Sequence, residues 1–221
     1  MPDRLIAISD IHGYREALDG LLAAIDPRPD DTIVPLGDFV DRGPDSRGVI
    51  DRLLQLERQC RMVPILGNHD EMMLLICEGY RELLADWLEF GGDATMASYD
   101  NRIPEAVPPE HIAFLRRCHL LLETEHHFFT HASYDPEVPL DCQSGELLRW
   151  QSLREQTPGP HRSGKTAIVA HTAQKDAEIL DLGYLKCIDT WIYGDGWLTA
   201  LEVHTGQVWQ VDQRGQFRGP S

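Results

Sequence analysis

Hydrophobic positions in the first third of the chain alternate between short apolar runs and helix-like repeats. The runs at 5–8, 32–36 and 62–66 have the length of buried strands. Between them, apolar residues recur at i, i+3, i+4 and i+7 over 14–25 and 46–56, which predicts two amphipathic helices. Asp45 or Ser46 can cap the second helix. This order predicts a βαβαβ unit with a parallel sheet, interrupted where Pro35 and Pro64 remove a donor.

The rest of the chain is less regular. Residues 70–90 are predicted to form one or two helices ending at Gly91 and Gly92, and residues 110–119 another helix. Short strands are expected at 120–122, 127–130 and 167–170, and mostly strands after residue 184. The polar, proline-containing stretch 134–164 predicts a lid-like loop with a short helix near Leu147.

Composition limits the class of protein. The 221 residues suit a single domain, 1–221, and the net charge of −16 counts against nucleic-acid binding. The five cysteines are scattered without C-x-x-C spacing, so neither a disulfide framework nor a structural zinc site is indicated. No signal peptide or membrane-spanning stretch is visible, so we expect a cytoplasmic protein without a membrane partner. The oligomeric state stays open.

Polar side chains with metal-ligand atoms follow the predicted strands. Ligands bind at the carboxyl ends of strands in such sheets, and oxygen and imidazole ligands without thiolate suit Mn, Fe or Zn. Asp38 is the candidate bridging carboxylate of a two-metal site. Taken singly, each residue could equally be a turn residue, a cap or a surface histidine. The candidate ligands are Asp10, His12, Asp38, Asn68, His131 and His171.

Three further residues suggest acid-base and phosphate chemistry. Asp41 could orient the imidazole of His69 for proton transfer. The planar guanidinium of Arg42 matches phosphate oxygens. The alternatives are that Asp41 caps the loop, that His69 merely starts a helix, and that Arg42 forms a surface ion pair.

The motifs at 10–13, 37–43 and 67–70 resemble the three signatures of the PPP-type metallophosphoesterases. That family includes serine/threonine protein phosphatases, phage-type phosphatases and symmetrical dinucleoside tetraphosphatases. The surroundings of His131 and His171 resemble its two later histidine motifs, so the likeness spans roughly 5–205. The resemblance implies an α/β four-layer sandwich, with two mixed β-sheets packed face to face and helices outside.

The resemblance also implies roles for the candidate residues. Two divalent metals, Mn2+ first and Fe or Zn as alternatives, would activate water for in-line attack on phosphorus. His69, oriented by Asp41, would protonate the leaving oxygen, and Arg42 and Asn68 would bind substrate. One metal would be held by Asp10, His12 and Asp38, the other by Asp38, Asn68, His131 and His171.

A second phosphate-binding arginine is expected between the late histidines. Arg154 is the first candidate, followed by Arg149 and Arg162. Trp191 and Tyr193 follow a strand end and could border the site. Departures from the family pattern at four positions point away from eukaryotic protein phosphatases and toward the small bacterial or phage-like branch. These positions are Ser9, Asp70, Ala170 and Trp191.

A competing motif lies at 159–166, which matches the P-loop pattern G-x-x-x-x-G-K-T. A functional P-loop follows a strand and opens a helix. Here a polar stretch precedes the motif and a predicted strand follows it. We therefore interpret the match as accidental and expect Lys165 to be dispensable for hydrolysis.

The sequence thus predicts a metal-dependent phosphoester hydrolase acting on a phosphorylated protein or small phosphoester. Phosphoserine/threonine protein or general phosphomonoester substrates are ranked narrowly first, because the acidic surface disfavours a polyanionic nucleotide. A symmetrical dinucleoside tetraphosphatase is the alternative. The two activities require pockets of different shape, and the loops 93–107 and 134–164, whose conformation does not follow from the sequence, set that shape. A catalytically silent binding module is the alternative from another class.

Overall fold

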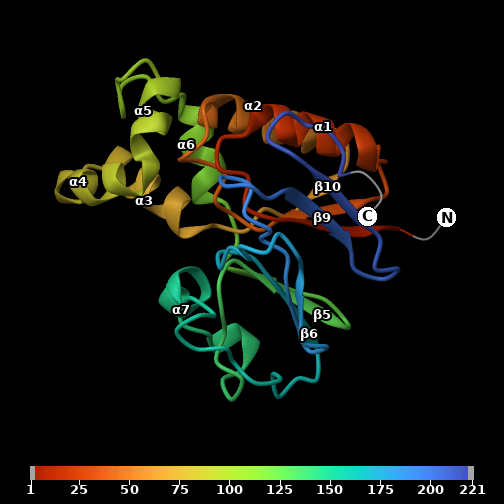
Figure 1. The fold of residues 1–221 in the computed structure, drawn as a ribbon. Helices are drawn as coiled ribbons and strands as arrows, with labels where there is room; N and C mark the ends of the chain where they lie inside the picture. The colour runs from red at the N-terminus through yellow and green to blue at the C-terminus, as the bar shows by residue number, and fades with distance from the viewer. Residues whose placement is uncertain (1–2, 219–221) are drawn as a thin grey trace.

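Two five-stranded mixed β-sheets form the centre of the molecule. The computed structural model describes residues 3–218. The strand orders are β10-β9-β1-β2-β3 and β4-β5-β6-β8-β7 (Figure 1). In the first sheet, the parallel strands β1, β2 and β3 lie at one edge, and β9 and β10 continue the sheet in antiparallel order. In the second sheet, the parallel strands β5, β6 and β8 lie at the centre, between antiparallel edge strands. The predicted pair of mixed sheets is confirmed.

The first sheet begins with the predicted βαβαβ unit. Its parallel strands are β1 (Leu5–Ile8), β2 (Thr32–Pro35) and β3 (Arg61–Met62). Strands β9 (Leu198–Glu202) and β10 (Val208–Val211) complete it in antiparallel order. Strand β3 ends before Pro64, but the amides of Val63 and Ile65 still donate to the carbonyls of Ile33 and Pro35 at 2.9 and 2.8 Å, so the interruption expected at Pro64 does not occur on this side. Ile65 also bridges His119.

The second sheet carries the later strands. Its parallel strands are β5 (His127–Thr130), β6 (Thr166–Val169) and β8 (Leu185–Cys187). Strands β4 (Leu121–Glu123) and β7 (Leu180–Asp181) pair antiparallel at the two edges. Because β6 starts at Thr166, a strand and not a helix follows the P-loop-like sequence, as predicted.

Hydrophobic side chains alternate between the two faces of the strands and form three layers of hydrophobic core. Ile6 and Ile8 of β1 pack beneath the helices, whereas Leu5 and Ala7 face the second sheet. In β6, Ile168 packs between the sheets, and its neighbours Ala167 and Val169 pack on the outer side. Successive side chains of a strand point to opposite faces, so each central strand stabilises two layers at once.

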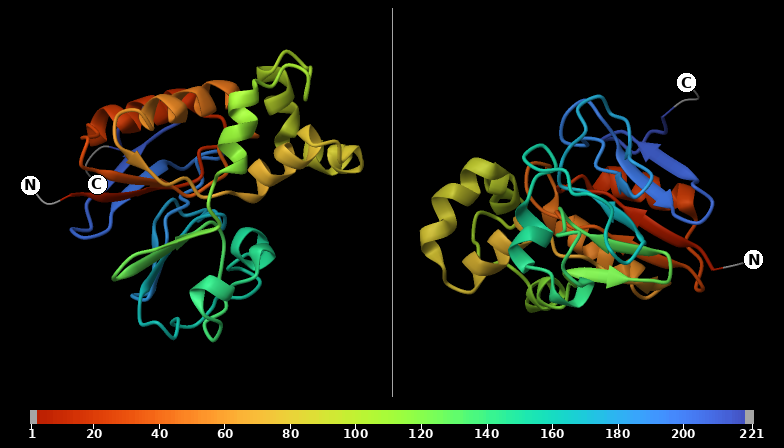
Figure 2. Two further views of the ribbon diagram at one scale, coloured as in Figure 1. Left: turned by 180° about the vertical axis from the view of Figure 1, so that it is seen from behind. Right: turned by 90° about the horizontal axis from the view of Figure 1, so that it is seen from below.

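Helices cover the outer faces. Helices α1 (Arg15–Ile25) and α2 (Ser46–Leu56) lie on the first sheet, and Asp45 caps α2 by accepting from the Gly48 amide at 2.8 Å (Figures 1 and 2). The second sheet is covered by the loop that holds η3 (Leu140–Cys142) and α7 (Gly145–Trp150). The short helix expected near Leu147 is therefore present.

A helical segment between residues 68 and 116 projects to one side of the sheets (Figure 2). The predicted helix end at Gly91 is confirmed, because Gly91 adopts a non-helical φ of 102°, and α5 begins directly after this kink. Among residues 3–218, no helix is long and apolar enough to cross a bilayer. The segment consists of α3 (Asn68–Cys77), η1 (Arg81–Leu83), α4 (Leu84–Trp87), the π-helical turn η2 (Leu88–Gly92), α5 (Asp93–Ser98) and α6 (Pro109–Arg116).

Candidate active site

The candidate ligands meet where strands of both sheets end. Asp10 and His12 follow β1, Asp38 follows β2, and His131 follows β5. Asn68 is the first residue of α3, and His171 lies just beyond β6. The carboxyl ends of parallel strands share one edge of a sheet, and here the edges of two sheets face each other.

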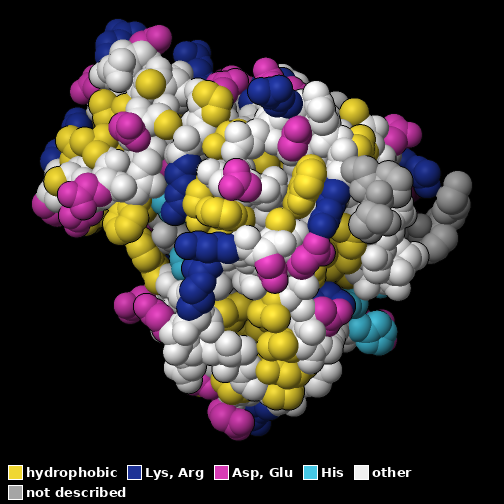
Figure 3. All heavy atoms as spheres, viewed as in Figure 1, with side chains coloured by type: hydrophobic (Ala, Val, Ile, Leu, Met, Phe, Trp, Pro, Cys, Tyr) yellow, Lys and Arg dark blue, Asp and Glu magenta, His cyan; other side chains and the backbone are white. Residues whose placement is uncertain are grey.

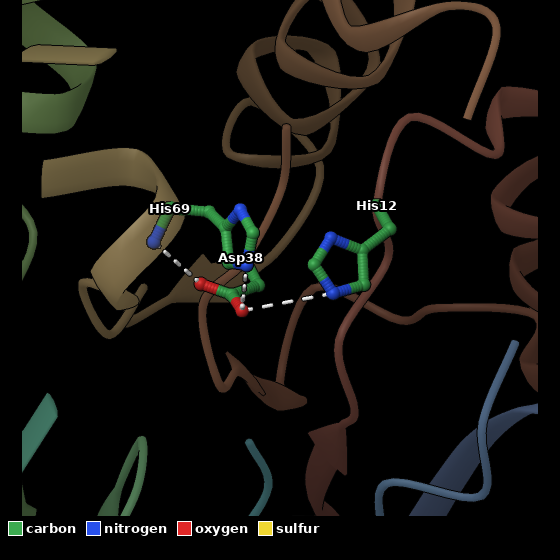
Figure 4. A group of neighbouring side chains, drawn as sticks. All are labelled: His12, Asp38 and His69. Carbon is green, nitrogen blue, oxygen red and sulfur yellow. Dashed lines mark hydrogen bonds and ion pairs between the residues drawn. The ribbon is translucent and has the colours of Figure 1, made fainter. Parts of the chain in front are cut away.

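Asp38 lies at the centre of this cluster. Its Oδ2 atom is 3.6 Å from Nε2 of His12 and 3.9 Å from Nε2 of His69 (Figure 4). Its Oδ1 atom is 3.5 Å from Nε2 of His131. The two carboxylate oxygens therefore face different imidazoles, which is the arrangement expected of a carboxylate shared between two cations.

The remaining ligands close the cluster. Oδ1 of Asn68 lies 3.0 Å from Nε2 of His131 and 3.0 Å from Nδ1 of His171. The backbone amide of His171 lies 3.4 Å from Oδ1 of Asp10, which joins the two halves of the chain. All six predicted ligands are thus brought together.

Backbone carbonyls fix the orientation of the imidazoles. Nδ1 of His12 lies 2.9 Å from the Val40 carbonyl oxygen, and Nδ1 of His131 lies 2.7 Å from that of Leu36. An Nδ1–H that donates to a carbonyl leaves Nε2 unprotonated and directed at Asp38, as a metal ligand requires. In this respect the residues fit a divalent metal.

Two ligand groups share Asp38. His12, Asp38 and His69 offer atoms within 4.8 Å of one another, and so do Asp38, His131 and His171. The first group contains His69, which the sequence analysis assigned to proton transfer. Asp10 lies nearby, with Oδ2 at 3.9 Å from Nε2 of His12. Because Nδ1 of His69 is bound by Asp41, Asp10 is the better candidate to complete this ligand group.

Several site residues have left-handed backbone conformations. The φ angle is 47° at His12, 49° at Asp38, 71° at Asp41, 71° at Arg42 and 62° at His171. Non-glycine residues adopt such angles at a cost of order 1–3 kcal/mol each, and they cluster at functional sites. The strained backbone is therefore concentrated around the proposed ligands.

The backbone of Gly67 lies very close to the side chain of Asp38. A Cβ atom added there would lie 2.1 Å from Oδ1 of Asp38. The amide of His69, two residues further on, donates to that same oxygen at 3.1 Å. Any side chain at position 67 would push Asp38 away, so the glycine is required by the geometry of the central carboxylate.

Burial shifts the pKa values of the ionisable groups in the cluster. It raises the pKa of Asp10, helped by the neighbouring charges of Asp189 and Asp38. It lowers the pKa of His12 and His131, and lowers that of His171 to about 3. The histidines are therefore neutral near pH 7, the form that binds metals. The clustered carboxylates, in contrast, need cations to balance their charge.

The proposed acid-base pair is formed. Nδ1 of His69 lies 2.7 Å from Oδ2 of Asp41, and both side chains are buried. The guanidinium of Arg42 lies beside this pair, with Nη2 3.0 Å from Nε2 of His69 and Nη1 2.8 Å from Nε2 of His12. It also stacks on the ring of Tyr193 at 4.0 Å. Arg42 would have to leave His12 for that nitrogen to bind a metal.

The candidates for a second arginine differ in their surroundings. Arg154 is exposed and donates to the Ala173 carbonyl, two residues beyond His171. Arg149 pairs with Glu71 at 2.6 Å. Arg162 donates to a backbone carbonyl on the lid-like loop, 25 residues away in sequence. Arg154 therefore keeps its place as the first candidate, and its role stays a prediction.

Three buried residues around the site were not assigned a role from sequence. Asp189 lies close enough to Asp10 to raise its pKa, and its Oδ2 has no hydrogen-bond partner among the described residues. Trp87 and Thr95 hydrogen-bond to Asp41 from the helical segment. Only the position of Asp189 after a strand was available as a signal.

The sequence of this chain is similar to those of known phosphoesterases. The calcineurin-like phosphoesterases match residues 3–195. A symmetrical bis(5'-nucleosyl)-tetraphosphatase of Janthinobacterium sp. (strain Marseille) is 35% identical over 59% of this chain and 44% of that protein. Serine/threonine-protein phosphatase 1 of Salmonella typhimurium is 39% identical over 39% of this chain and 38% of that protein. The chain spans less than half the length of each of these relatives.

Solved structures share the fold at low identity. The cold-active protein-tyrosine phosphatase of a Shewanella species has a TM-score of 0.69 at 18% identity, covering 99% of this chain and 82% of that one. A serine/threonine phosphatase of Saccharomyces cerevisiae has a TM-score of 0.61 at 17% identity, covering 98% and 79%. With residues 3–195 matched, this chain belongs to the calcineurin-like phosphoesterase family.

Proposed function

We propose that this chain hydrolyses phosphoester or phosphoanhydride bonds with the help of two divalent metals, with Mn2+ as the first candidate and Fe or Zn as alternatives. The convergence of six potential ligands on Asp38 carries the proposal. Asp10, His12 and Asp38 would hold one ion, and Asp38, Asn68, His131 and His171 would hold the other. When bound, such ions activate water and stabilise negative charge on phosphoryl oxygens.

His69 supplies the proton to the leaving oxygen. Its Nδ1–H donates to Asp41 at 2.7 Å, which directs Nε2 toward the central carboxylate. An imidazole held in this way can donate from Nε2 in its protonated form, and the buried Asp41 stabilises that positive charge. Alkoxide leaving groups depend on this proton more than acidic phenols do.

Arg42 binds the phosphoryl group. Its two terminal nitrogens already face the histidines of the cluster, and the stacked ring of Tyr193 restricts the plane of the guanidinium. A planar fork pairs with two phosphate oxygens at once. Asn68 and Arg154 are proposed to assist in substrate binding. In Figure 3, basic side chains gather in the middle of one face, next to partly visible histidines.

A dinucleoside tetraphosphate is the first candidate substrate, which reverses the order given by the sequence. The similarity to symmetrical bis(5'-nucleosyl)-tetraphosphatases supports it. Two aromatic rings at the site also support it: that of Phe90, 50% exposed, lies 6.3 Å from the His69 ring, and that of Tyr193 lies 5.1 Å from the His12 ring. Aromatic surfaces bind bases by stacking, worth about 1–3 kcal/mol per base.

A phosphoserine/threonine protein remains the second candidate, supported by the similarity to serine/threonine-protein phosphatase 1. The catalytically silent binding module is disfavoured because all six ligand positions carry ligand atoms. Cytoplasmic location, a single domain and the absence of a nucleic-acid partner stay predictions.

A side-by-side rate measurement in Mn2+ tests the proposal. The substrates are diadenosine tetraphosphate, a phosphoserine/phosphothreonine peptide, a phosphotyrosine peptide and a chromogenic aryl phosphate. We expect the highest kcat/KM for the dinucleotide, with ADP as the sole product. The variant Asp38→Ala, prepared in parallel, controls for contaminating phosphatases. A preference for the phosphopeptide would restore the original order, and no hydrolysis of any substrate at any Mn2+ concentration would support the binding module.

A further inference from the structure

Both carboxylate oxygens of Asp41 are held by the helical segment that lies beside the site. Oγ1 of Thr95 donates to Oδ1 at 2.7 Å, and Nε1 of Trp87 donates to Oδ2 at 2.9 Å. That same Oδ2 atom accepts from His69. Asp41, Trp87 and Thr95 are all fully buried. The carboxylate therefore has one orientation, and two of its three partners lie outside the signature motifs.

Thr95 also holds the backbone of Asp41. The Asp41 amide donates to Oγ1 of Thr95 at 2.8 Å and lies 3.1 Å from Oγ of Ser46. The two hydroxyl oxygens are 2.7 Å apart, so Ser46 can donate to Thr95 while Thr95 donates to the carboxylate. One threonine thus fixes both the main chain and the side chain of Asp41.

The neighbouring glycines make this contact possible. The Arg42 amide donates to the Gly91 carbonyl at 3.0 Å, and a Cβ at Gly91 would lie 2.8 Å from Cγ of Arg42. A Cβ at Gly92 would lie 2.4 Å from Cδ2 of Trp87. The kink at Gly91 therefore brings Trp87 and Thr95 to the same residue. It also supports Asp41 and Arg42 in their left-handed conformations.

We propose that Trp87 and Thr95 are positioning residues for proton transfer to the leaving group. They hold Asp41 against Nδ1 of His69, and so keep Nε2 of His69 directed at the scissile bond. The inference rests on the proposed function, in which His69 protonates the leaving oxygen. The helical segment between residues 84 and 98 then positions Asp41 and His69 for catalysis, in addition to stabilising the fold.

The dependence of the rate on the leaving group tests the proposal. Trp87→Phe removes the indole donor but keeps an aromatic ring, and Thr95→Val removes the hydroxyl at nearly constant volume. We expect each variant to lower kcat for an alkyl phosphate ester about 10- to 100-fold, part of the range for losing a general acid. For 2,4-dinitrophenyl phosphate, whose leaving oxygen needs no proton, kcat should change less than about 2-fold.

Two controls are matched to these variants. Thr95→Ser keeps the hydroxyl and should restore most of the alkyl-ester rate. Tyr99→Phe removes a buried hydroxyl from the same region, one that contacts His111 at 2.7 Å and not Asp41. It should leave the rates with both esters unchanged. Equal losses with both esters in Trp87→Phe and Thr95→Val, or no loss with either, would overturn the proposal.

A proton NMR measurement separates this proposal from the proposed function, because it requires no turnover. The Nδ1 proton of His69, assigned by its loss in His69→Asn, should give a downfield signal in the wild type. In both Trp87→Phe and Thr95→Val the signal should shift upfield or broaden. An unchanged signal in both variants would overturn the proposal even if the protein hydrolysed none of the substrates. If Trp87→Phe fails to fold, the isosteric Thr95→Val variant alone tests the proposal by the same signal.

Discussion

Nδ1 of His69 lies 2.7 Å from Oδ2 of Asp41, although the two residues are 28 positions apart in sequence. The pair is buried, and no other carboxylate contacts this nitrogen among the described residues. The contact fixes which nitrogen of His69 faces Asp38, and it therefore links the loop after β2 to the first turn of α3.

Replacing His69 tests its assignment as a proton donor. His69→Asn should lower turnover of a substrate with a poor leaving group by roughly 10²–10⁴-fold, the range expected for losing a general acid. Metal content, measured by elemental analysis of the Mn2+-loaded protein, should stay unchanged. Loss of one ion in this variant would instead make His69 a ligand, as its grouping with His12 and Asp38 allows.

Metal affinity should depend on pH through the buried carboxylates. Burial raises the pKa of Asp10 and raises that of Asp189 to about 6, so both carry protons under mildly acidic conditions where ordinary carboxyls are ionised. Metals must displace these protons, so Mn2+ affinity should fall as the pH is lowered from about 7 to about 5. The histidine ligands have lowered pKa values and should contribute little there.

Calorimetry in buffers of different ionisation enthalpy measures this effect. Wild-type protein should release protons on binding Mn2+ near pH 6, and Asp189→Asn should release roughly half a proton fewer, because a group with a pKa of about 6 is half protonated at that pH. Identical affinities at the two ends of the range, with no proton release, would contradict the linkage between the carboxylates and the metals.

Arg42 should contribute mainly to phosphate binding. Hydrogen bonds to charged groups contribute about 1.5–3 kcal/mol, so Arg42→Lys should weaken competitive inhibition by inorganic phosphate roughly 10- to 100-fold. Lysine keeps the charge but loses the fork and the stacking on Tyr193. Arg154→Ala is the comparison variant, and a similar loss there would identify the second arginine. Unchanged inhibition in Arg42→Lys would exclude the proposed role.

Lys165 should be dispensable. Its Nζ atom lies 2.7 Å from Oε1 of Glu123, and the next residue begins β6, so no helix amides face a phosphate here. Lys165→Ala should keep kcat/KM within about 2-fold of the wild type for the preferred substrate, because it removes only an ion pair and a hydrogen bond to the Thr124 carbonyl. A tenfold loss would show that the P-loop-like sequence takes part in the reaction.

Local sequence patterns predicted most of the fold and which candidate ligands would lie together. The spacing of apolar residues predicted α1 and α2, and the polar residues after successive strands predicted the cluster around Asp38. Such patterns work because strand ends in one sheet share an edge.

Contacts between distant residues could not be predicted in this way. The Gly91–Gly92 pair indicated a helix end, but not that the kink there brings Trp87 and Thr95 into contact with Asp41. Likewise, no local pattern indicates that His111 and His161 are buried, as the structure shows them to be. His111 contacts Tyr99 and Asp51, and His161 lies 2.8 Å from the Val138 carbonyl oxygen. None of these three partners can be read from the local periodicity of the sequence.

The most direct test of the account combines metal counting with activity. Protein stripped by a chelator should hydrolyse none of the substrates. After loading with Mn2+, the wild type should bind about two ions per chain and regain activity, as a two-metal site requires. The variant Asp38→Ala should lose both ions and all activity, because both ligand groups share that carboxylate. Full activity in the stripped protein, or two retained ions in Asp38→Ala, would contradict the account.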